Sequence, residues 1–197
     1  KDGAVPFVRV ESHEPARVKR VLDMGAHGIM FPQIRDAGEA RQAVQYMHYP
    51  PKGIRGVAKM VRATQYAKNF DDYYRFAGDG LLGIIQIETK TCLEHLDEIA
   101  GIDGVDVLFV GPADLSMALG VFGQWDHPDF VAAVRATSEA ARNAGKAAGV
   151  LFFDIDQYDF YYSHGYRFLA SGSDMLFISR GAATRVREMK GKRSRHL

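Results

Sequence analysis

The sequence is short of cysteine, of long apolar runs and of net charge. Cys92 is the single cysteine among 197 residues, which excludes an intrachain disulfide and a cysteine-based metal cluster. An unpaired thiol is typical of a reducing compartment, so we expect a cytoplasmic protein. No apolar run approaches the ~20 residues of a transmembrane helix. The net charge of +1 argues against nucleic acid or a membrane as the main partner.

Apolar segments of strand length alternate with segments of helical pattern along the chain. Their spacing of about 25 to 40 residues is typical of βα units, and the length predicts a single domain over residues 1–197. Six such units fit either an open parallel sheet or a (β/α)8 barrel that lacks its first two units. The expected strands are residues 5–10, 28–32, 83–87, 105–110, 147–153 and 166–170. The expected helices are residues 14–23, 37–47, 71–77, 91–99, 115–119, 126–145, 156–164 and, after an apolar stretch at 175–178, 182–190.

The isoleucine-rich stretch Gly83–Thr89 organises this pattern. It is apolar on both faces, which is typical of a buried parallel strand, and it ends in Glu88. The expected strand at 105–110 runs into Gly111-Pro112-Ala113-Asp114 and delivers a second carboxylate. If the two strands are neighbours, about 4.8 Å apart, the carboxylates of Glu88 and Asp114 could share one cation. Oxygen ligands favour Mg²⁺ or Mn²⁺.

Each of these residues also has an ordinary structural interpretation. Asp114 could cap the helix expected at 115–119, and Glu88 could be a helix-start charge or part of a surface ion pair. Arg9 ends the first expected strand, where an arginine could hold a developing oxyanion. Its alternative role is an ion pair with Glu11 or another acidic residue.

Two further features point to an anionic substrate that chelates a metal. Gln86 lies two residues before Glu88, so it faces the same side of the strand and could orient a metal ligand or a water. The turn at 111–114 offers free backbone N–H groups at a helix start, a position that binds anions. Together a metal and an anion pocket suit a 2-oxo acid. The seven histidines show no metal-ligand spacing and no obvious general base.

Aromatic residues and the cysteine are expected to have structural roles. Trp125 and the tyrosines between Tyr158 and Tyr162 are interpreted as packing or interface residues, and Cys92 as a packing residue without a catalytic partner. Basic residues gather only at 190–196, which we interpret as a solvated tail.

Several sequence strings resemble the HpcH/HpaI aldolase family of metal-dependent (class II) pyruvate aldolases. This family includes 4-hydroxy-2-oxoheptanedioate aldolase and 2-dehydro-3-deoxyglucarate aldolase. The resemblance runs from about Val5 to Ile178, and the QIET and GPADLS strings, in this order, are its most specific part. The strings are Pro6–Val10, Ala26–Pro32, Tyr49–Val57, Gln86–Thr89 and Val110–Ser116.

The resemblance implies a (β/α)8 TIM barrel of the phosphoenolpyruvate/pyruvate type whose first two βα units are absent from this chain. It implies that Glu88 and Asp114 bind the metal, and that Arg9 contacts the keto oxygen and stabilises the enolate. The substrate carboxylate would lie on the backbone N–H groups of Ala113 and Asp114, and Gln86 would line the site. In the family a histidine near the start is linked to proton transfer, and nothing in this chain matches it.

The function that the resemblance implies is reversible cleavage of a 4-hydroxy-2-oxo acid to pyruvate and an aldehyde through a metal-bound enolate. Mg²⁺ or Mn²⁺ is the expected metal, with Co²⁺ as a further candidate. The alternatives are a CoA-ester lyase of the citrate lyase β type, an oxaloacetate decarboxylase on the same scaffold, or an inactive assembly subunit or fragment. The compact GPADLS string favours the aldolase branch. The resemblance also implies a homo-oligomer, a hexamer or trimer of dimers that exchange C-terminal helices.

Overall fold

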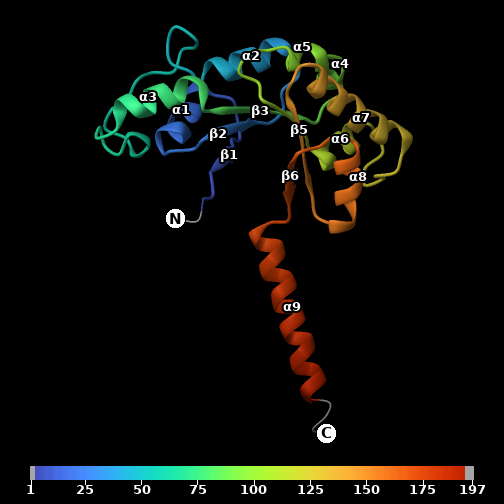
Figure 1. Cartoon of the computed structure of the whole chain (residues 1–197). Helices are drawn as coiled ribbons and strands as arrows, with labels where there is room; N and C mark the ends of the chain where they lie inside the picture. The colour runs from blue at the N-terminus through green and yellow to red at the C-terminus, as the bar shows by residue number, and fades with distance from the viewer. Residues whose placement is uncertain (1–2, 194–197) are drawn as a thin grey trace.

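The computed structural model describes residues 3–193, and its centre is one sheet of six parallel strands. Each strand pairs with the next one in the chain, so the spatial order is the sequence order (Figure 1). This confirms the predicted α/β fold with a parallel sheet. The strands are β1 (Phe7–Arg9), β2 (Gly28–Phe31), β3 (Leu82–Ile87), β4 (Val107–Val110), β5 (Ala147–Phe152) and β6 (Phe168–Ser171).

The helices between the strands begin where the sequence supplies a cap or a proline. The Asp36 side chain accepts a hydrogen bond from the Glu39 backbone N–H, as expected for an N-cap. Proline stands in the first turn of α1, α6 and α7, where no backbone donor is needed. The helices are α1 (Pro15–Asp23), α2 (Ala37–Gln45), α3 (Phe70–Asp79), α4 (Lys90–Glu94), α5 (Leu96–Ala100), α6 (Pro112–Ala118), α7 (Pro128–Asn143), α8 (Tyr158–Ser163) and α9 (Asp174–Arg193), with 3-10 turns η1 (Arg62–Thr64) and η2 (Ile155–Gln157).

Most helices lie within two residues of their expected bounds, α6 begins three residues early at Pro112, and two helices differ more strongly. The helix expected at 91–99 is divided into α4 and α5 at His95, whose φ of −117° and ψ of 19° lie outside the helical region. The helix expected at 182–190 already begins at Asp174 and includes the apolar stretch 175–178. It extends away from the sheet in Figure 1, and the Ser173 hydroxyl accepts a hydrogen bond from Leu176 N–H in its first turn. The apolar stretch 175–178 therefore forms the beginning of α9 and is not a separate element.

The long loop at 54–69 contains the 3-10 turn η1 and is fastened by a buried arginine. Arg55 donates from Nη2 to Asp23 Oδ1 at 2.7 Å and to the Tyr73 hydroxyl at 2.9 Å. The guanidinium also lies 4.7 Å from the ring centre of Tyr49. These contacts join the loop to α1 and α3, although apolar side chains of the loop such as Ile54 and Met60 are exposed.

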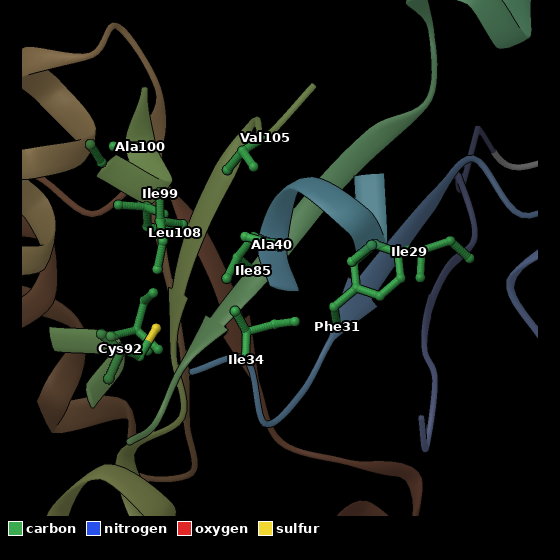
Figure 2. Close-up of a cluster of buried hydrophobic side chains, with 14 of the residues drawn as sticks. Ile29, Phe31, Ile34, Ala40, Ile85, Cys92, Ile99, Ala100, Val105 and Leu108 are labelled. Carbon is green, nitrogen blue, oxygen red and sulfur yellow. The ribbon is translucent and has the colours of Figure 1, made fainter. Parts of the chain in front are cut away.

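A large apolar layer fills the space between the sheet and the helices. Because side chains alternate along a strand, Ile85 and Ile87 of β3 face this layer, whereas Ile84 and Gln86 face the other side. Cys92 is buried in the layer, as predicted, and burial raises the pKa of its thiol to about 12. Figure 2 shows part of the layer, including Ile29, Phe31, Ile34, Ala40, Ile85, Ile99, Ala100, Val105 and Leu108.

A smaller apolar cluster lies on the concave face of the sheet and shows how strongly the sheet curves. The ring centres of Phe7 in β1 and Phe168 in β6 lie 5.6 Å apart, edge to face, although these are the outermost strands. Phe168 also contacts Phe109 of β4 at 6.0 Å. Glycine leaves room for these rings, because a Cβ on Gly28 would lie 2.6 Å from the Phe7 ring and one on Gly149 2.6 Å from the Phe109 ring. The sheet therefore has a filled, barrel-like interior.

Within residues 3–193, every helix is too short or too polar to span a bilayer.

Candidate active site

The pairing of β3 with β4 places the two predicted acidic residues at the same edge of the sheet. Gln86 lies opposite Phe109 and Ile87 opposite Val110, and the Gly111 backbone N–H donates to Ile87 O at 3.2 Å. The chain then brings Glu88 beside Gly111, on the concave face. Asp114 follows in the first turn of α6. The expectation that the two strands are neighbours is thus confirmed.

Glu88 is buried and has two unequal carboxylate oxygens. Its exposed fraction is 3%, which rules out a surface ion pair. The backbone N–H of Gln33 donates to Oε1 at 2.6 Å, and the side-chain Nε2 of Gln33 donates to the same oxygen at 3.1 Å. Gln33 has a φ of 56°, in the left-handed region, and this conformation accompanies the inward-pointing N–H. Oε1 is therefore satisfied by the protein, and Oε2 is left to face Gly111.

Gly111 provides the space that Oε2 of Glu88 occupies. A Cβ at this position would lie 2.9 Å from Glu88 Oε2 and 2.6 Å from Gln86 Nε2. The Gln86 side chain is buried, and its Oε1 has no hydrogen-bond partner among the described residues 3–193. A buried amide oxygen without a partner is costly, so it indicates a ligand or water. The Glu88 Oε2 oxygen and the Gln86 amide nitrogen thus lie against Gly111, and the Gln86 amide oxygen is left for a ligand or water.

The negative charge of the Glu88 carboxylate is only partly compensated by its surroundings. Burial raises the pKa of the Glu88 carboxyl above its ordinary range, and the Asp114 carboxylate raises it further. The hydrogen bonds from Gln33 and the positive charge of Arg9 act in the opposite direction. A cation between Glu88 and Asp114 would favour the ionised form of both.

The donor set fits a hard divalent cation with few protein ligands. Within residues 3–193, no group of three or more His, Cys, Asp and Glu side chains is placed to hold a metal ion. Mg²⁺ is commonly held by one or two carboxylates, with the other positions filled by water and substrate. Glu88 and Asp114 would be such a pair, with Gln86 supporting a ligand through its amide. The alternative role of Asp114 as an N-cap is wrong, because Gly111 caps α6 and Asp114 lies inside the helix.

A cavity of about 570 Å³ opens at this edge of the sheet. The predicted site residues Arg9, Gln86, Ala113 and Asp114 all line it. Glu88 lies just beneath, behind Gly111. The cavity thus brings together residues from the ends of β1 and β3 and the start of α6. The alternative partner of Arg9, Glu11, forms its ion pair with Arg17 instead.

Several residues of the site escaped prediction. Gln33 follows Pro32 at the end of β2, and a polar residue at a strand end was the signal that could have marked it. Asp154 lines the cavity from the loop after β5. Trp125 and Tyr161 were expected to pack, and they do: Trp125 lies 5.5 Å from Phe130, edge to face, and Tyr161 is 1% exposed. Both also line the cavity.

Comparison with known proteins assigns the chain to a family. The profile of the HpcH/HpaI aldolase/citrate lyase family matches residues 2–180. The chain belongs to this family. Its members typically depend on a divalent metal ion.

Relatives at about 38% identity are aldolases. The chain is 38% identical over 177 residues to the 4-hydroxy-2-oxo-heptane-1,7-dioate aldolase of Klebsiella pneumoniae, covering 90% of this chain and 67% of that protein. It is 38% identical over 192 residues to the 2-dehydro-3,6-dideoxy-6-sulfogluconate aldolase of Pseudomonas putida, covering 98% of this chain and 75% of that protein.

Solved structures agree with the fold. An HpcH/HpaI aldolase/citrate lyase family protein from Burkholderia cenocepacia superposes with a TM-score of 0.88 at 37% identity, covering 94% of this chain and 73% of that one. The HpcH/HpaI aldolase from Desulfitobacterium hafniense gives a TM-score of 0.87 at 30% identity, covering 95% and 73%. These matches confirm the predicted family and architecture.

Proposed function

We propose that this chain is a divalent-metal-dependent aldolase that reversibly cleaves a 4-hydroxy-2-oxo acid to pyruvate and an aldehyde. The observation that carries the proposal is the buried Glu88 carboxylate, with Oε1 held by Gln33 and Oε2 against Gly111, a residue that lines the same cavity as Arg9 and Asp114. Membership of the family and aldolase relatives at 38% identity support it.

Glu88 and Asp114 would hold Mg²⁺ or Mn²⁺, with Co²⁺ as a third candidate. When bound, such an ion supplies Lewis-acid polarisation of the 2-oxo group. The roles of the chain's own residues follow from their positions. The backbone N–H groups of Ala113 and Asp114 lie in the first turn of α6, where donors have no partner within the helix, so they can receive the substrate carboxylate.

Arg9 and Gln86 would act on the reacting end of the substrate. Arg9 lines the cavity from the end of β1, where its guanidinium can stabilise negative charge that develops on the keto oxygen. Gln86 carries a buried amide that donates and accepts without ionising, so it orients a water or ligand rather than moving a proton. Gln33 keeps Glu88 in one orientation.

The test is pyruvate release with a coupled lactate dehydrogenase assay. The full chain with Mg²⁺ or Mn²⁺ should release pyruvate from a 4-hydroxy-2-oxo acid, lose this activity after EDTA treatment and regain it on metal addition. Glu88→Gln should abolish the release, whereas Glu98→Gln, which neutralises an exposed carboxylate on α5, should leave it unchanged. Release that persists in metal-free protein would contradict the proposal. Comparison with acyl-CoA esters and oxaloacetate as substrates separates the lyase and decarboxylase alternatives.

We also infer that the chain assembles into a homo-oligomer. α9 extends from the rest of the chain (Figure 1), and Met175, Phe177 and Ile178 near its start are 71%, 62% and 68% exposed. Burial of these side chains by another copy would be favourable. Light scattering should give a multiple of 21.9 kDa, six-fold for the expected hexamer. A particle of 21.9 kDa at micromolar concentration would contradict the inference, and an oligomer without pyruvate release would favour an inactive assembly subunit.

A further inference from the structure

The lining of the cavity consists of a polar set and an apolar set of side chains. Arg9, Gln86 and Asp114 belong to the polar set, to which the proposed function assigns the 2-oxo acid. The remaining lining is dominated by apolar and aromatic side chains from β4, β5, α8 and the loops between them. These include Phe109, Leu151, Phe153, Trp125 and Tyr161. The second half of the substrate, the aldehyde, must therefore contact this aromatic surface.

The charged side chains that line the cavity include more acidic than basic residues, and this affects which aldehyde can bind. Among the described residues 3–193, the charged residues that line the cavity are Arg9, Asp114 and Asp154. Arg9 and Asp114 serve the 2-oxo acid and the metal. The remaining charge in the lining is the carboxylate of Asp154, which follows the apolar lining residues Leu151 and Phe153 in the chain, just after β5.

Asp154 is held in place by its own turn. Its Oδ1 accepts a hydrogen bond from the Asp156 backbone N–H at 3.2 Å, so the carboxylate caps the 3-10 turn η2 and stays near the cavity. A second anionic group on the substrate would meet this carboxylate, and within residues 3–193 the one cationic side chain in the lining is Arg9, which serves the 2-oxo acid. Asp154 is itself exposed, so water moderates this repulsion, which is strongest at low ionic strength.

We propose that the aldehyde which this chain joins to pyruvate is uncharged and apolar or aromatic. The inference rests on the proposed function and specifies its substrate class. It separates this chain from the relatives described above: a heptane-1,7-dioate carries two carboxylates, and a 6-sulfogluconate carries a carboxylate and a sulfonate. An aldehyde with a hydrocarbon tail instead buries that tail against Trp125, Phe153 and Tyr161.

The bond changes are those of an aldol addition. The methyl carbon of pyruvate loses a proton to water and forms a bond to the aldehyde carbon. The aldehyde oxygen takes up a proton and becomes the 4-hydroxyl group. Nothing is oxidised or reduced, so no further reactant is needed.

The experiment compares two aldehydes of equal length with the full chain in the presence of Mn²⁺. Butanal and succinic semialdehyde differ only in that a methyl group is replaced by a carboxylate. We expect kcat/KM for addition to pyruvate to be about fivefold higher with butanal at low ionic strength. Asp154→Lys should reverse the preference, and Asp154→Asn should narrow it several-fold. Asp156→Asn, which neutralises an exposed acid in the same turn, should leave the ratio unchanged.

A separate measurement distinguishes failure of this inference from failure of the proposed function. Exchange of the pyruvate methyl protons in D₂O, followed by NMR without any aldehyde, reports only on the metal and the 2-oxo acid. If exchange occurs but succinic semialdehyde is preferred, or if Asp154→Lys leaves the ratio unchanged, the inference is overturned and the aldolase proposal stands. If metal-loaded chain catalyses no exchange, both are overturned.

Discussion

Replacement of Gly111 by alanine gives the sharpest test of the proposed metal site. The added Cβ would lie 2.6 Å from Gln86 Nε2 and 2.9 Å from Glu88 Oε2. Carbon and a polar heavy atom in ordinary contact are about 3.5 Å apart, so each side chain must retreat by roughly 0.6 to 0.9 Å. The backbone itself is not strained, because a φ of −93° suits alanine as well as glycine.

The retreat should weaken both metal binding and folding. Oε1 of Glu88 is held by two hydrogen bonds from Gln33, so the carboxylate can move only by breaking them or by turning Oε2 aside. Metal–oxygen distances tolerate about 0.2 Å, which is well below the displacement. We expect Mn²⁺ affinity to fall at least tenfold, about 1.4 kcal/mol. Overpacking should reduce the free energy of unfolding by about 1–3 kcal/mol.

The control is a glycine-to-alanine replacement at a position where the added Cβ has free space. Gly78 lies in α3, and a Cβ there would have no neighbouring atom within 4 Å. Gly78→Ala should leave Mn²⁺ affinity unchanged and stabilise the fold by about 0.5–1 kcal/mol.

Calorimetric titration with Mn²⁺ and urea unfolding measure the two effects. If Gly111→Ala binds Mn²⁺ as tightly as the parent chain and releases pyruvate at the same rate, Oε2 of Glu88 does not face the metal. The reasoning from the Gly111 contact would then be refuted.

Three further predictions follow from other contacts. Gln33→Ala removes the 3.1 Å side-chain hydrogen bond to Glu88 but keeps the backbone hydrogen bond. Mn²⁺ affinity should fall about tenfold, the lower end of the range for residues that support a metal ligand. Unchanged affinity in a titration would show that Glu88 needs no such support. Arg55→Ala removes the charged hydrogen bond to Asp23, which keeps its ion pair with Lys19, and should cost about 1.5–3 kcal/mol in urea unfolding. A loss below about 1 kcal/mol, the size typical of a surface ion pair, would contradict this. Burial raises the pKa of Cys92 from 9.0 to about 12, so the folded state favours the protonated thiol. This contribution to stability is present below pH 9 and is lost as the pH rises towards 12. The thiol should also react with a disulfide reagent far more slowly in the native chain than in urea.

The fold was largely predictable because parallel strands that are buried on both faces appear in the sequence as continuous apolar runs. The run Gly83–Ile87 has no polar residue except Gln86, and its bounds were predicted to within one residue. Short helices were less predictable. The break at His95 has no glycine or proline to signal it, and the tertiary packing of α5 determines where the second helix starts.

The candidate site was predictable where its residues follow strands in the sequence. Arg9, Gln86, Glu88 and Asp114 belong to strand ends, and the structure gathers them at one edge. Gln33 was missed because its contact with Glu88 joins residues that are 55 positions apart and depends on a left-handed backbone. Neither a contact between distant residues nor a left-handed backbone at a glutamine can be recognised from a pattern in the sequence. The loop residues that line the cavity, such as Asp154, were missed for a similar reason, since loop paths depend on packing.

The unequal size of the two apolar layers has a consequence for laboratory evolution. Among residues 3–193, most of the buried side chains lie between the helices and the convex face, whereas Ile84, Val107 and Phe109 are the buried members of the concave cluster. Met30, Leu151 and Ala170, which border the concave cluster, are only partly buried and also line the cavity. A mutant library confined to these positions would reshape the mouth of the cavity while the part of the fold that resists unfolding stays intact, so many of its members should remain folded enough to be screened with new aldehydes.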